Sequence, residues 1–430
     1  MNEADSIDYI NAIEEHKYVP QGNKKPLSTL YMILVVATLC SGGGIIYTFP
    51  QPAAAIGPVP GLIVSLVTGI IVAYTLDLLV IHLNVKSFKL NDELICIRFP
   101  KWRIVILFFT RMSSFILHGT YCIGNFLYFA SGIQTLINIH HNISTGALTG
   151  ITFACMFVLS MILDRNICAK LSIAIAPVPI FNLAATLYYG IRDSTPESWA
   201  CFKDSWRHPS QYGLFRTDYG AAITACFQFA AQYFSSYYCH NTVPLQVTRA
   251  RSPKHRRLVP LCTIIALFIL YWVSQVVGQA PYACYNVSSD VLPPSEYMSL
   301  FGSTGFGIAA DSIFIIGLIG NTPITYSVQR DMAFEIWDWT SRTRLRTVLD
   351  VIFNICIIVI SALFYYYNVS IQTLLEIGGV SCAIVWVALV PCLWDIYVSH
   401  NTVYLKFKAV FTFAVCVFVI CIEILQFCKL

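Results

Sequence analysis

Three consecutive glycines and two prolines interrupt the first long apolar stretch of the chain, at Gly42, Gly43, Gly44, Pro50 and Pro52. Inside a helix each glycine costs about 0.5–1 kcal/mol relative to alanine, and each proline removes a backbone donor. We therefore expect the helix to unwind here and to expose peptide groups that bind a small ligand. The amino end of the half-helix that follows suits a carboxylate. The predicted substrate-binding residues are Ser41, Gly42, Gly43, Gly44 and Ile45. Close helix packing through small residues is the alternative.

A second irregular stretch, from Phe229 to Pro244, alternates polar and aromatic residues. Tyr233, Ser235 and Ser236 are the candidates to contact a substrate from this side. An aromatic belt at the membrane surface is an equally good explanation of the tyrosines that follow.

Five ionisable residues fall inside apolar stretches, where a charge costs several kcal/mol and suggests function. They are Asp77, Arg111, His118, Asp311 and Glu376. We expect Asp77 and Arg111 to form a structural ion pair. His118 is the candidate for carrying a proton, because an imidazole changes charge near neutral pH. Glu376 is expected near the outer end of its stretch, in contact with water.

The composition requires a bilayer to position these residues. Of 430 residues, 57% are hydrophobic and only 12% are charged, about half the ~25% usual in soluble domains. The net charge of +4 is scattered, and no basic tract indicates nucleic-acid binding. Apolar stretches long enough to span a membrane number eleven, at 28–57, 59–83, 103–137, 145–163, 169–189, 219–239, 258–279, 303–326, 347–367, 372–398 and 405–427.

The positive charges predict the orientation of these spans. Lys and Arg are retained on the cytoplasmic side, and 21 of the 27 fall in segments that are cytoplasmic if the amino terminus is inside. Residues 1–27 form a polar cytoplasmic tail in this scheme, and the carboxyl terminus is extracellular or lumenal. The sequons at Asn142 and Asn286 fall outside and predict glycosylation. These exterior sequons favour the plasma membrane or an endolysosomal or vesicular membrane.

Two of the 16 cysteines stand apart from the rest. Cys201 and Cys284 lie in the two longest exterior loops, where oxidising conditions preserve disulfides, and we expect them to form a bridge. No Cys/His spacing typical of a metal site appears, so no metal or other cofactor is expected.

Interruptions at matching places in the first and sixth spans favour an all-α membrane fold. It would be a five-plus-five inverted repeat, with the site between the halves and one extra helix at the end.

The chain resembles the amino acid/auxin permease family, part of the amino acid–polyamine–organocation superfamily, over nearly all of 28–427. Four segments carry the resemblance, each on the expected helix: Gly42–Ile45 with Phe49-Pro50, Cys239–Pro244 with Arg251–Lys254, Asn321–Ile324 running to Arg330, and Leu375–Val380 running to Pro391. The resemblance implies secondary active transport of amino acids by alternating access, with the substrate held between the first and sixth helices.

Coupling is where the chain departs from its sodium-coupled relatives. Those relatives usually place an asparagine in the second half of the first helix, where this chain has Ala54 and Ala55. Asn321 and Thr322 supply only the eighth-helix part of an ion site. Proton coupling or exchange is therefore favoured over sodium coupling.

A membrane enzyme is disfavoured, since no nucleophile or metal motif is present. A channel fits two broken helices less well than a carrier does. A non-transporting amino acid sensor with the same fold remains the alternative.

Overall fold

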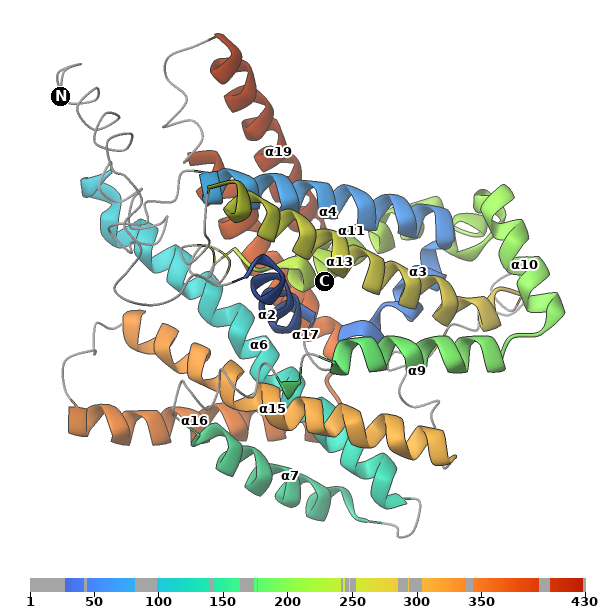
Figure 1. Cartoon of the computed structure of the whole chain (residues 1–430), viewed down its shortest axis with the longest axis horizontal. Coiled ribbons are helices and arrows are strands. Elements are labelled where there is room, and N and C mark those ends of the chain that lie inside the picture. Colours follow the sequence, from blue (N-terminus) through green and yellow to red (C-terminus); the bar gives the residue numbers. More distant parts are fainter. Residues whose placement is uncertain are drawn as a thin grey trace.

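A computed structural model describes residues 28–41, 45–81, 99–138, 143–162, 174–175, 177–240, 243, 247, 253–284, 293, 304–336, 343–393 and 403–427. Every regular element within these residues is a helix, and no strand occurs among them (Figure 1). The α-helices are α2 (Thr29–Ser41), α3 (Pro50–Ile56), α4 (Pro58–Ile81), α6 (Arg103–Asn138), α7 (Thr145–Ser160), α9 (Val178–Arg192), α10 (Pro196–Arg207), α11 (Tyr219–Tyr237), α13 (Pro253–Gln279), α15 (Gly305–Ile336), α16 (Thr343–Tyr366), α17 (Ile371–Cys382) and α19 (Val403–Phe427).

Shorter helical segments connect or extend these helices. The 3₁₀ turns are η1 (Ile45–Thr48), η2 (Pro100–Trp102), η3 (Pro209–Gln211), η4 (Gly213–Arg216) and η5 (Ala280–Tyr282). A π-helix, η7 (Ala383–Leu389), continues α17 with a wider turn. Such π segments are rare and often mark functional or strained places in a helix.

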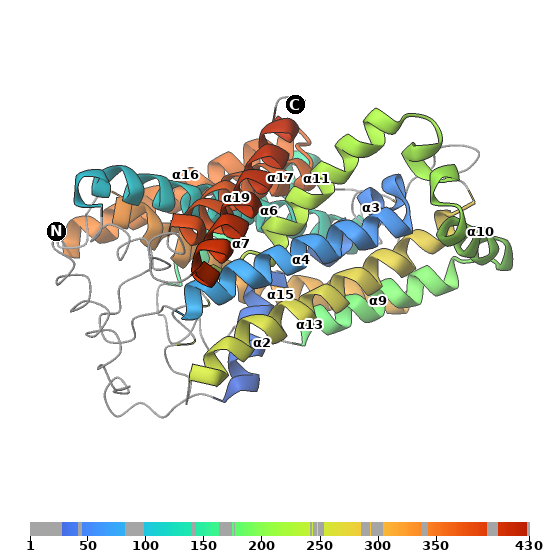
Figure 2. The same cartoon turned by 90° about the horizontal axis from the view of Figure 1, so that it is seen from above.

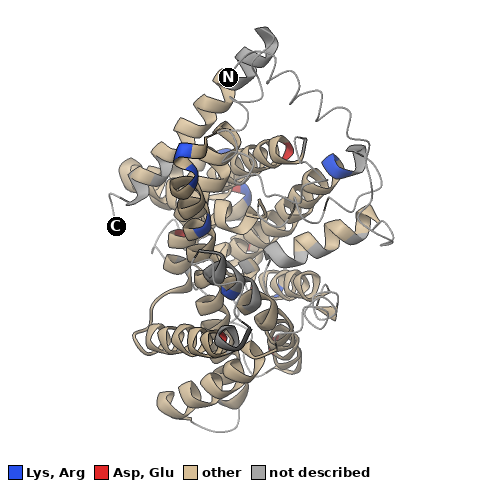
Figure 3. Cartoon of the chain, turned by 90° about the vertical axis from the view of Figure 1, so that its left-hand side faces the viewer, with Lys and Arg blue, Asp and Glu red and all other residues tan. Residues whose placement is uncertain are grey.

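The described helices are suited to a bilayer. Six of them are long and apolar enough to cross a membrane, and two shorter apolar helices lie at Thr145–Ser160 and Val410–Cys421. Few Lys, Arg, Asp or Glu residues interrupt the described helices in the view of Figure 3. Each of the eleven predicted ranges contains at least part of a described helix, although the count of eleven membrane crossings stays a prediction.

The helices form two packed groups. On one side α13 packs against α4, α9 and α2, and α4, α13 and α9 run side by side in Figures 1 and 2. On the other side α6 packs against α15, α16 and α17, with α7 against α16 and α15. Helix α11 contacts both α4 and α17. This arrangement places α11 between the two groups.

Helices α6 and α15 run antiparallel, and three contacts fix their register. The Asn125 side chain donates to Thr325 Oγ1 at 3.3 Å. A Cβ on Gly132 would lie 3.0 Å from Ile315, and one on Gly119 would lie 3.2 Å from Gln329. The start of α15 is therefore level with the end of α6.

A small helical cap crosses one end of the bundle, at the right in Figure 1. It consists of α10, η3 and η4, and Thr195 caps the start of α10 by accepting a hydrogen bond from the Ser198 backbone N–H at 3.1 Å. Cys201 of α10 is joined to Cys284, which follows η5, in a disulfide with a Cα–Cα distance of 5.2 Å. This is the pair predicted from the exterior loops, and we call this end of the molecule the disulfide side.

The cap lies directly against the first helix. Gly213 has a φ of +60°, and a Cβ there would lie within 2.4 Å of the Ala55 carbonyl oxygen in α3. Only glycine allows both this backbone conformation and this close approach. The sequence predicted a loop at 190–218, without the helix α10, because α10 has a polar composition typical of loops.

Candidate functional site

The first predicted span is not one continuous α-helix. Helix α2 ends at Ser41, Ile45–Thr48 form the 3₁₀ turn η1, and α3 starts at Pro50. Gly42, Gly43 and Gly44 lie outside the described residues, and nothing is shown for the side chains of Ser41 and Ile45. The interruption of α-helical structure itself is established by η1 and the bend at Phe49.

Backbone carbonyls of η1 bond side chains from other helices. Ser274 of α13 donates to the Ile46 carbonyl at 3.0 Å. Gln232 of α11 donates from Nε2 to the hydroxyl of Thr48 at 2.8 Å and approaches its carbonyl at 3.4 Å. A buried carbonyl that leaves the helical ladder needs such a partner. The break in the first helix is therefore built into the packing of α11 and α13.

The sixth predicted span also breaks, later than the sequence suggested. Helix α11 is regular to Tyr237, and Tyr238 leaves it with φ −64° and ψ 117°. The last carbonyls are partly satisfied by tyrosines, since Tyr121 donates to the Ser235 carbonyl at 2.7 Å and Tyr271 to the Ser236 carbonyl at 3.4 Å. The two breaks thus lie on elements that hydrogen-bond each other through Gln232.

The three candidates on α11 are all fully buried but have different roles. Tyr233 donates to Gln275 at 2.6 Å, and its ring centroid lies 4.7 Å from that of Phe49, so its hydroxyl is occupied. Ser236 donates to the Gln232 carbonyl at 2.8 Å. The Ser235 hydroxyl is buried without a hydrogen-bond partner. Ser235 is therefore the candidate whose side chain is left for a ligand.

Gln232 is a residue that the sequence reasoning missed. Its Nε2 bonds Thr48 while its Oε1 is buried without a partner. The signal was present in the sequence, because Gln232 precedes Ser235 and Ser236 by three and four residues and so shares their helix face. Helix α17 supports this part of α11 closely, since a Cβ on Gly379 would lie 2.3 Å from the Ala231 carbonyl oxygen.

The candidate ion-coupling residues do not form one site. His118 Nδ1 lies 2.8 Å from the Ser114 carbonyl on α6. Thr322 of α15 donates to the Leu318 carbonyl at 2.7 Å, and Asn321 is also buried. His118 adjoins Gly119, which faces Gln329, so it lies about two turns below Asn321 along α15. The structure does not bring His118 together with Asn321 and Thr322.

A row of polar and aromatic side chains near His118 runs from α6 past the end of α11 to α4. The Ser114 hydroxyl lies 3.3 Å from the Tyr238 hydroxyl, and the Tyr238 ring stacks on His240 with centroids 5.7 Å apart. His240 Nε2 lies 3.0 Å from the Thr75 hydroxyl of α4, and its Nδ1 is buried without a hydrogen bond. In the sequence, His240 stands out only as part of the segment Cys239–Pro244. It is the second buried histidine next to the break in the sixth helix.

The predicted ion pair between Asp77 and Arg111 is wrong. Asp77 pairs with Arg257, whose Nε and Nη2 donate to the two carboxylate oxygens at 2.8 Å each. The reason is the start of α13 at Pro253, five residues before the predicted boundary, which turns Arg257 from a loop residue into a neighbour of α4. Glu376 is also buried, at 5% exposure, whereas the sequence predicted that it would contact water.

The cap carries its own polar contacts. The Tyr212 hydroxyl donates to the Asp204 carboxylate at 2.7 Å. Burial, and then the hydrogen bond to Asp204, raise the pKa of Tyr212 to about 12. The hydrogen bond to Asp193 raises the pKa of Arg192, at the end of α9.

The predicted glycosylation sites Asn142 and Asn286 lie outside the described residues.

Solved transporters share this fold. The structure of MhsT in complex with L-phenylalanine matches with a TM-score of 0.60 and 13% identity, over 94% of this chain and 100% of that one. A sodium-coupled sialic acid symporter matches with a TM-score of 0.57 and 12% identity, over 98% and 95%. A manganese transporter of Eremococcus coleocola, bound to an aromatic bis-isothiourea compound, matches with a TM-score of 0.54 and 13% identity, over 95% and 88%.

No protein-family model matches the chain. No curated protein matches it in sequence either. The resemblance to the amino acid/auxin permeases therefore stays a prediction. The matches to solved structures show the fold alone. The apolar helices and these matches indicate that the chain is a multi-pass integral membrane protein with the fold of transporters.

Proposed function

We propose that the chain is a secondary active transporter that carries amino acids across a membrane by alternating access. The observation that supports this most is the contact between the two interrupted spans, in which Gln232, five residues before the end of α11, donates to Thr48 of η1. Broken helices that face each other at membrane depth are typical of substrate sites in transporters, because unwound backbone survives there only when it is paired or faces a cavity.

The chemistry of the unpartnered groups favours a zwitterion. Gln232 Oε1 accepts hydrogen bonds, as an ammonium group requires, and the Ser235 hydroxyl can donate or accept. The glycine triplet of the sequence would present peptide N–H groups to a carboxylate. The matched structures span an amino acid, a metal ion and a sugar acid, so the substrate class rests on these residues and on the sequence motifs.

Proton coupling or exchange is proposed over sodium coupling. Ala54 of α3 stands where sodium-coupled permeases usually carry an asparagine, and its side chain supplies no ligand. The Thr322 hydroxyl donates to the Leu318 carbonyl and has its oxygen lone pairs left, so it could supply one oxygen ligand only. His118 is the proposed proton-carrying residue beside the sixth-helix break, and Asn321 and Thr322 are the secondary candidates.

In this proposal residues 28–427 form the transport domain and residues 1–27 a cytoplasmic tail. The partners are an amino acid, a proton and the lipid bilayer. The disulfide side faces the cell exterior or an organelle lumen, where the Cys201–Cys284 bridge persists.

The test is uptake by the purified full chain in lipid vesicles. Each of the twenty amino acids, radiolabelled, is offered with a sodium gradient, with a pH gradient, and with unlabelled amino acid inside. The proposal expects saturable accumulation or exchange of at least one amino acid, independent of sodium. Saturable binding with no accumulation and no exchange would indicate the sensor instead, and the absence of both binding and movement would reject an amino acid ligand.

A further inference from the structure

Asp311 is a buried carboxylate that the proposed substrate site does not use. It lies in the second turn of α15, toward the disulfide side, and its side chain is 0% exposed. Neither carboxylate oxygen has a hydrogen-bond partner. A charged carboxylate left unpaired in such a place costs several kcal/mol, which a bound proton removes. The neutral carboxylic acid is the form that this environment accommodates.

Aromatic rings gather around Phe314, three residues after Asp311 on α15. Tyr47 of η1 reaches this part of α15. The neighbouring Phe314 ring lies 5.5 Å from the Tyr47 ring and 5.6 Å from the Tyr128 ring of α6. Among the described residues, no Lys, Arg or His forms an ion pair with the Asp311 carboxylate. A metal cation would need a shell of several oxygens, which rings do not supply.

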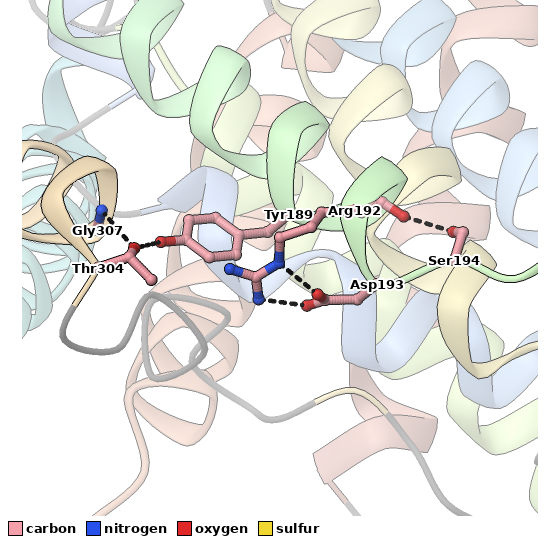
Figure 4. A network of polar contacts seen from close by, with 7 residues as sticks. Tyr189, Arg192, Asp193, Ser194, Thr304 and Gly307 are labelled. Carbon is pink, nitrogen blue, oxygen red and sulfur yellow. Dashed lines mark hydrogen bonds and ion pairs between the residues drawn. The ribbon is translucent and has the colours of Figure 1, made fainter.

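Residues with hydroxyl groups lie between this carboxyl and the surface of the disulfide side. The turn η1, which carries Tyr47, packs against α9, which carries Tyr189. The Tyr189 hydroxyl lies 3.2 Å from the hydroxyl of Thr304, which accepts from the Gly307 N–H at 3.1 Å and is exposed (Figure 4). Each of these hydroxyls can accept one proton and donate another. The order from water inward is Thr304, Tyr189, Tyr47 and Asp311.

An ion pair lies beside the outer part of this path. The Arg192 guanidinium stands over the Tyr189 ring at 4.3 Å and is paired with Asp193 at 2.6 Å (Figure 4). This pair orients the Tyr189 ring next to Thr304 and leaves the phenol without a net charge beside it. The arrangement holds the middle hydroxyl of the path in place.

We propose that Asp311 is a proton-binding site of the carrier, loaded from the disulfide side through Thr304, Tyr189 and Tyr47. On loading, a proton from water forms an O–H bond at the Asp311 carboxylate, and each hydroxyl on the way passes on its own proton as it receives the next. On release that O–H bond breaks and the proton returns to water. The inference rests on the proposed transport function only in linking this proton to substrate movement.

Asp311 and His118 lie at well-separated levels along α15. His118 is level with Gln329 on α15, roughly 27 Å from Asp311 at 1.5 Å per residue. A carrier that alternates between two sides needs proton access from each. Asp311 supplies a group on the disulfide side that His118 is too distant to provide.

The test compares the wild type with Asp311→Asn in vesicles that carry a pH gradient. Asparagine keeps the shape and neutrality of the protonated acid but cannot lose a proton. We expect the amino acid that the wild type moves to exchange in the variant at a similar rate. Accumulation driven by the gradient, which reaches up to about tenfold per pH unit for one proton per substrate, should fall to about onefold. Accumulation equal to that of the wild type would overturn the proposal, and so would loss of exchange, since it would make Asp311 a substrate ligand.

Two matched variants sharpen this test. Ser312→Ala alters the adjacent residue of α15, whose hydroxyl only bonds the Ile308 carbonyl, and should accumulate substrate like the wild type. Tyr189→Phe removes the middle hydroxyl and should slow gradient-driven uptake severalfold while exchange persists. Unchanged uptake in Tyr189→Phe would contradict the proposed path.

A measurement without substrate separates this inference from the proposed function. Infrared difference spectra of the purified full chain should show a protonated carboxyl band, absent in Asp311→Asn, that disappears as pH rises. If this band is present but no amino acid moves, the proton site stands and the transport proposal fails. If amino acids move and Asp311→Asn retains the band, the proton site is wrong.

Discussion

Gln232 in the sixth predicted span donates from Nε2 to the hydroxyl of Thr48 in the first, across 2.8 Å. Both residues are buried, and they come from segments 184 residues apart in the sequence. This contact joins the turn η1 of the first span to the regular part of α11, five residues before that helix ends at Tyr237. Gln232 Oε1 and the hydroxyl of Ser235, three residues further along α11, are both buried without a hydrogen-bond partner.

Gln232→Ala should raise the apparent KM for amino acid uptake about tenfold. The substitution removes the bond to Thr48 and the free acceptor, and a buried hydrogen bond contributes about 1 kcal/mol net, or more when a partner is left unsatisfied. Concentration-dependent uptake in vesicles measures this. Gln228→Ala, one turn away on α11, is the control and should stay within about twofold of the wild type. Equal KM values for Gln232→Ala and the wild type would contradict the role of Gln232.

Ser235→Ala and Ser236→Ala form a matched pair on one helix. The Ser235 hydroxyl has no partner in the structure, whereas the Ser236 hydroxyl bonds the Gln232 carbonyl. We expect Ser235→Ala to weaken substrate affinity about tenfold, the value of one lost hydrogen bond, with a smaller effect from Ser236→Ala. Equilibrium binding of the transported amino acid in detergent gives both values. A larger loss in Ser236→Ala would assign the ligand contact to the wrong serine.

Removing the disulfide should destabilise the protein by about 2–5 kcal/mol, as for native bridges that close long loops. Cys201 and Cys284 are 83 residues apart, and their bridge ties α10 to the end of α13. Thermal unfolding of Cys201→Ser in detergent, compared with Cys421→Ser as an exposed free-cysteine control, measures the effect. A melting temperature that is equal in both variants would show that the bridge contributes no stability.

The pair Asp77 and Arg257 should couple, while Asp77 and Arg111 should not. Double-mutant cycles with Asp77→Asn, Arg257→Gln and Arg111→Gln give the two coupling energies from unfolding. Because the Arg257 and Asp77 side chains are 59% and 31% exposed, we expect at most about 1 kcal/mol for the first pair. The second coupling should be about zero. The reverse order would restore the ion pair expected from the sequence.

Alkali should loosen the cap through Tyr212. Its pKa is raised to about 12 in the folded protein, above the ordinary value of 10.0. The neutral phenol is therefore favoured by folding, and its contribution is present below pH ~10 and is lost as the pH rises toward ~12. Tyr212→Phe removes this contribution, so the difference in melting temperature between wild type and variant should shrink across that window. A difference that grows with pH would contradict the assignment.

Much of the architecture could be predicted from the sequence, because span positions depend on local hydropathy. Most predicted boundaries, such as those of α4, α6 and α11, lie within a few residues of the described helices. The cap helix α10 could not be predicted in this way, since it is amphipathic and polar. The early start of α13 was also missed, because Pro253–Arg257 is charged and resembles a loop.

The positions of the two helix breaks could be predicted from the sequence, but the side chains that contact each other around them could be predicted only in part. The glycines and prolines located the break in the first span. The polar stretch from Phe229 to Pro244 located the break in the sixth span to within a helical turn or two. The sequence pointed to Tyr233 and did not single out Gln232, because hydrogen-bond partners such as Gln275, which accepts from Tyr233, come from helices distant in sequence. The same limit explains why Arg111 was chosen in place of Arg257 as the partner of Asp77.

The most direct test of the account is a structure of the full chain with its transported amino acid bound. The account predicts density for the amino acid between residues 41–48 and the side chains of Gln232 and Ser235, with the α-helix interrupted at 45–49. Density for the amino acid elsewhere, or a continuous α-helix through residues 41–56, would contradict it.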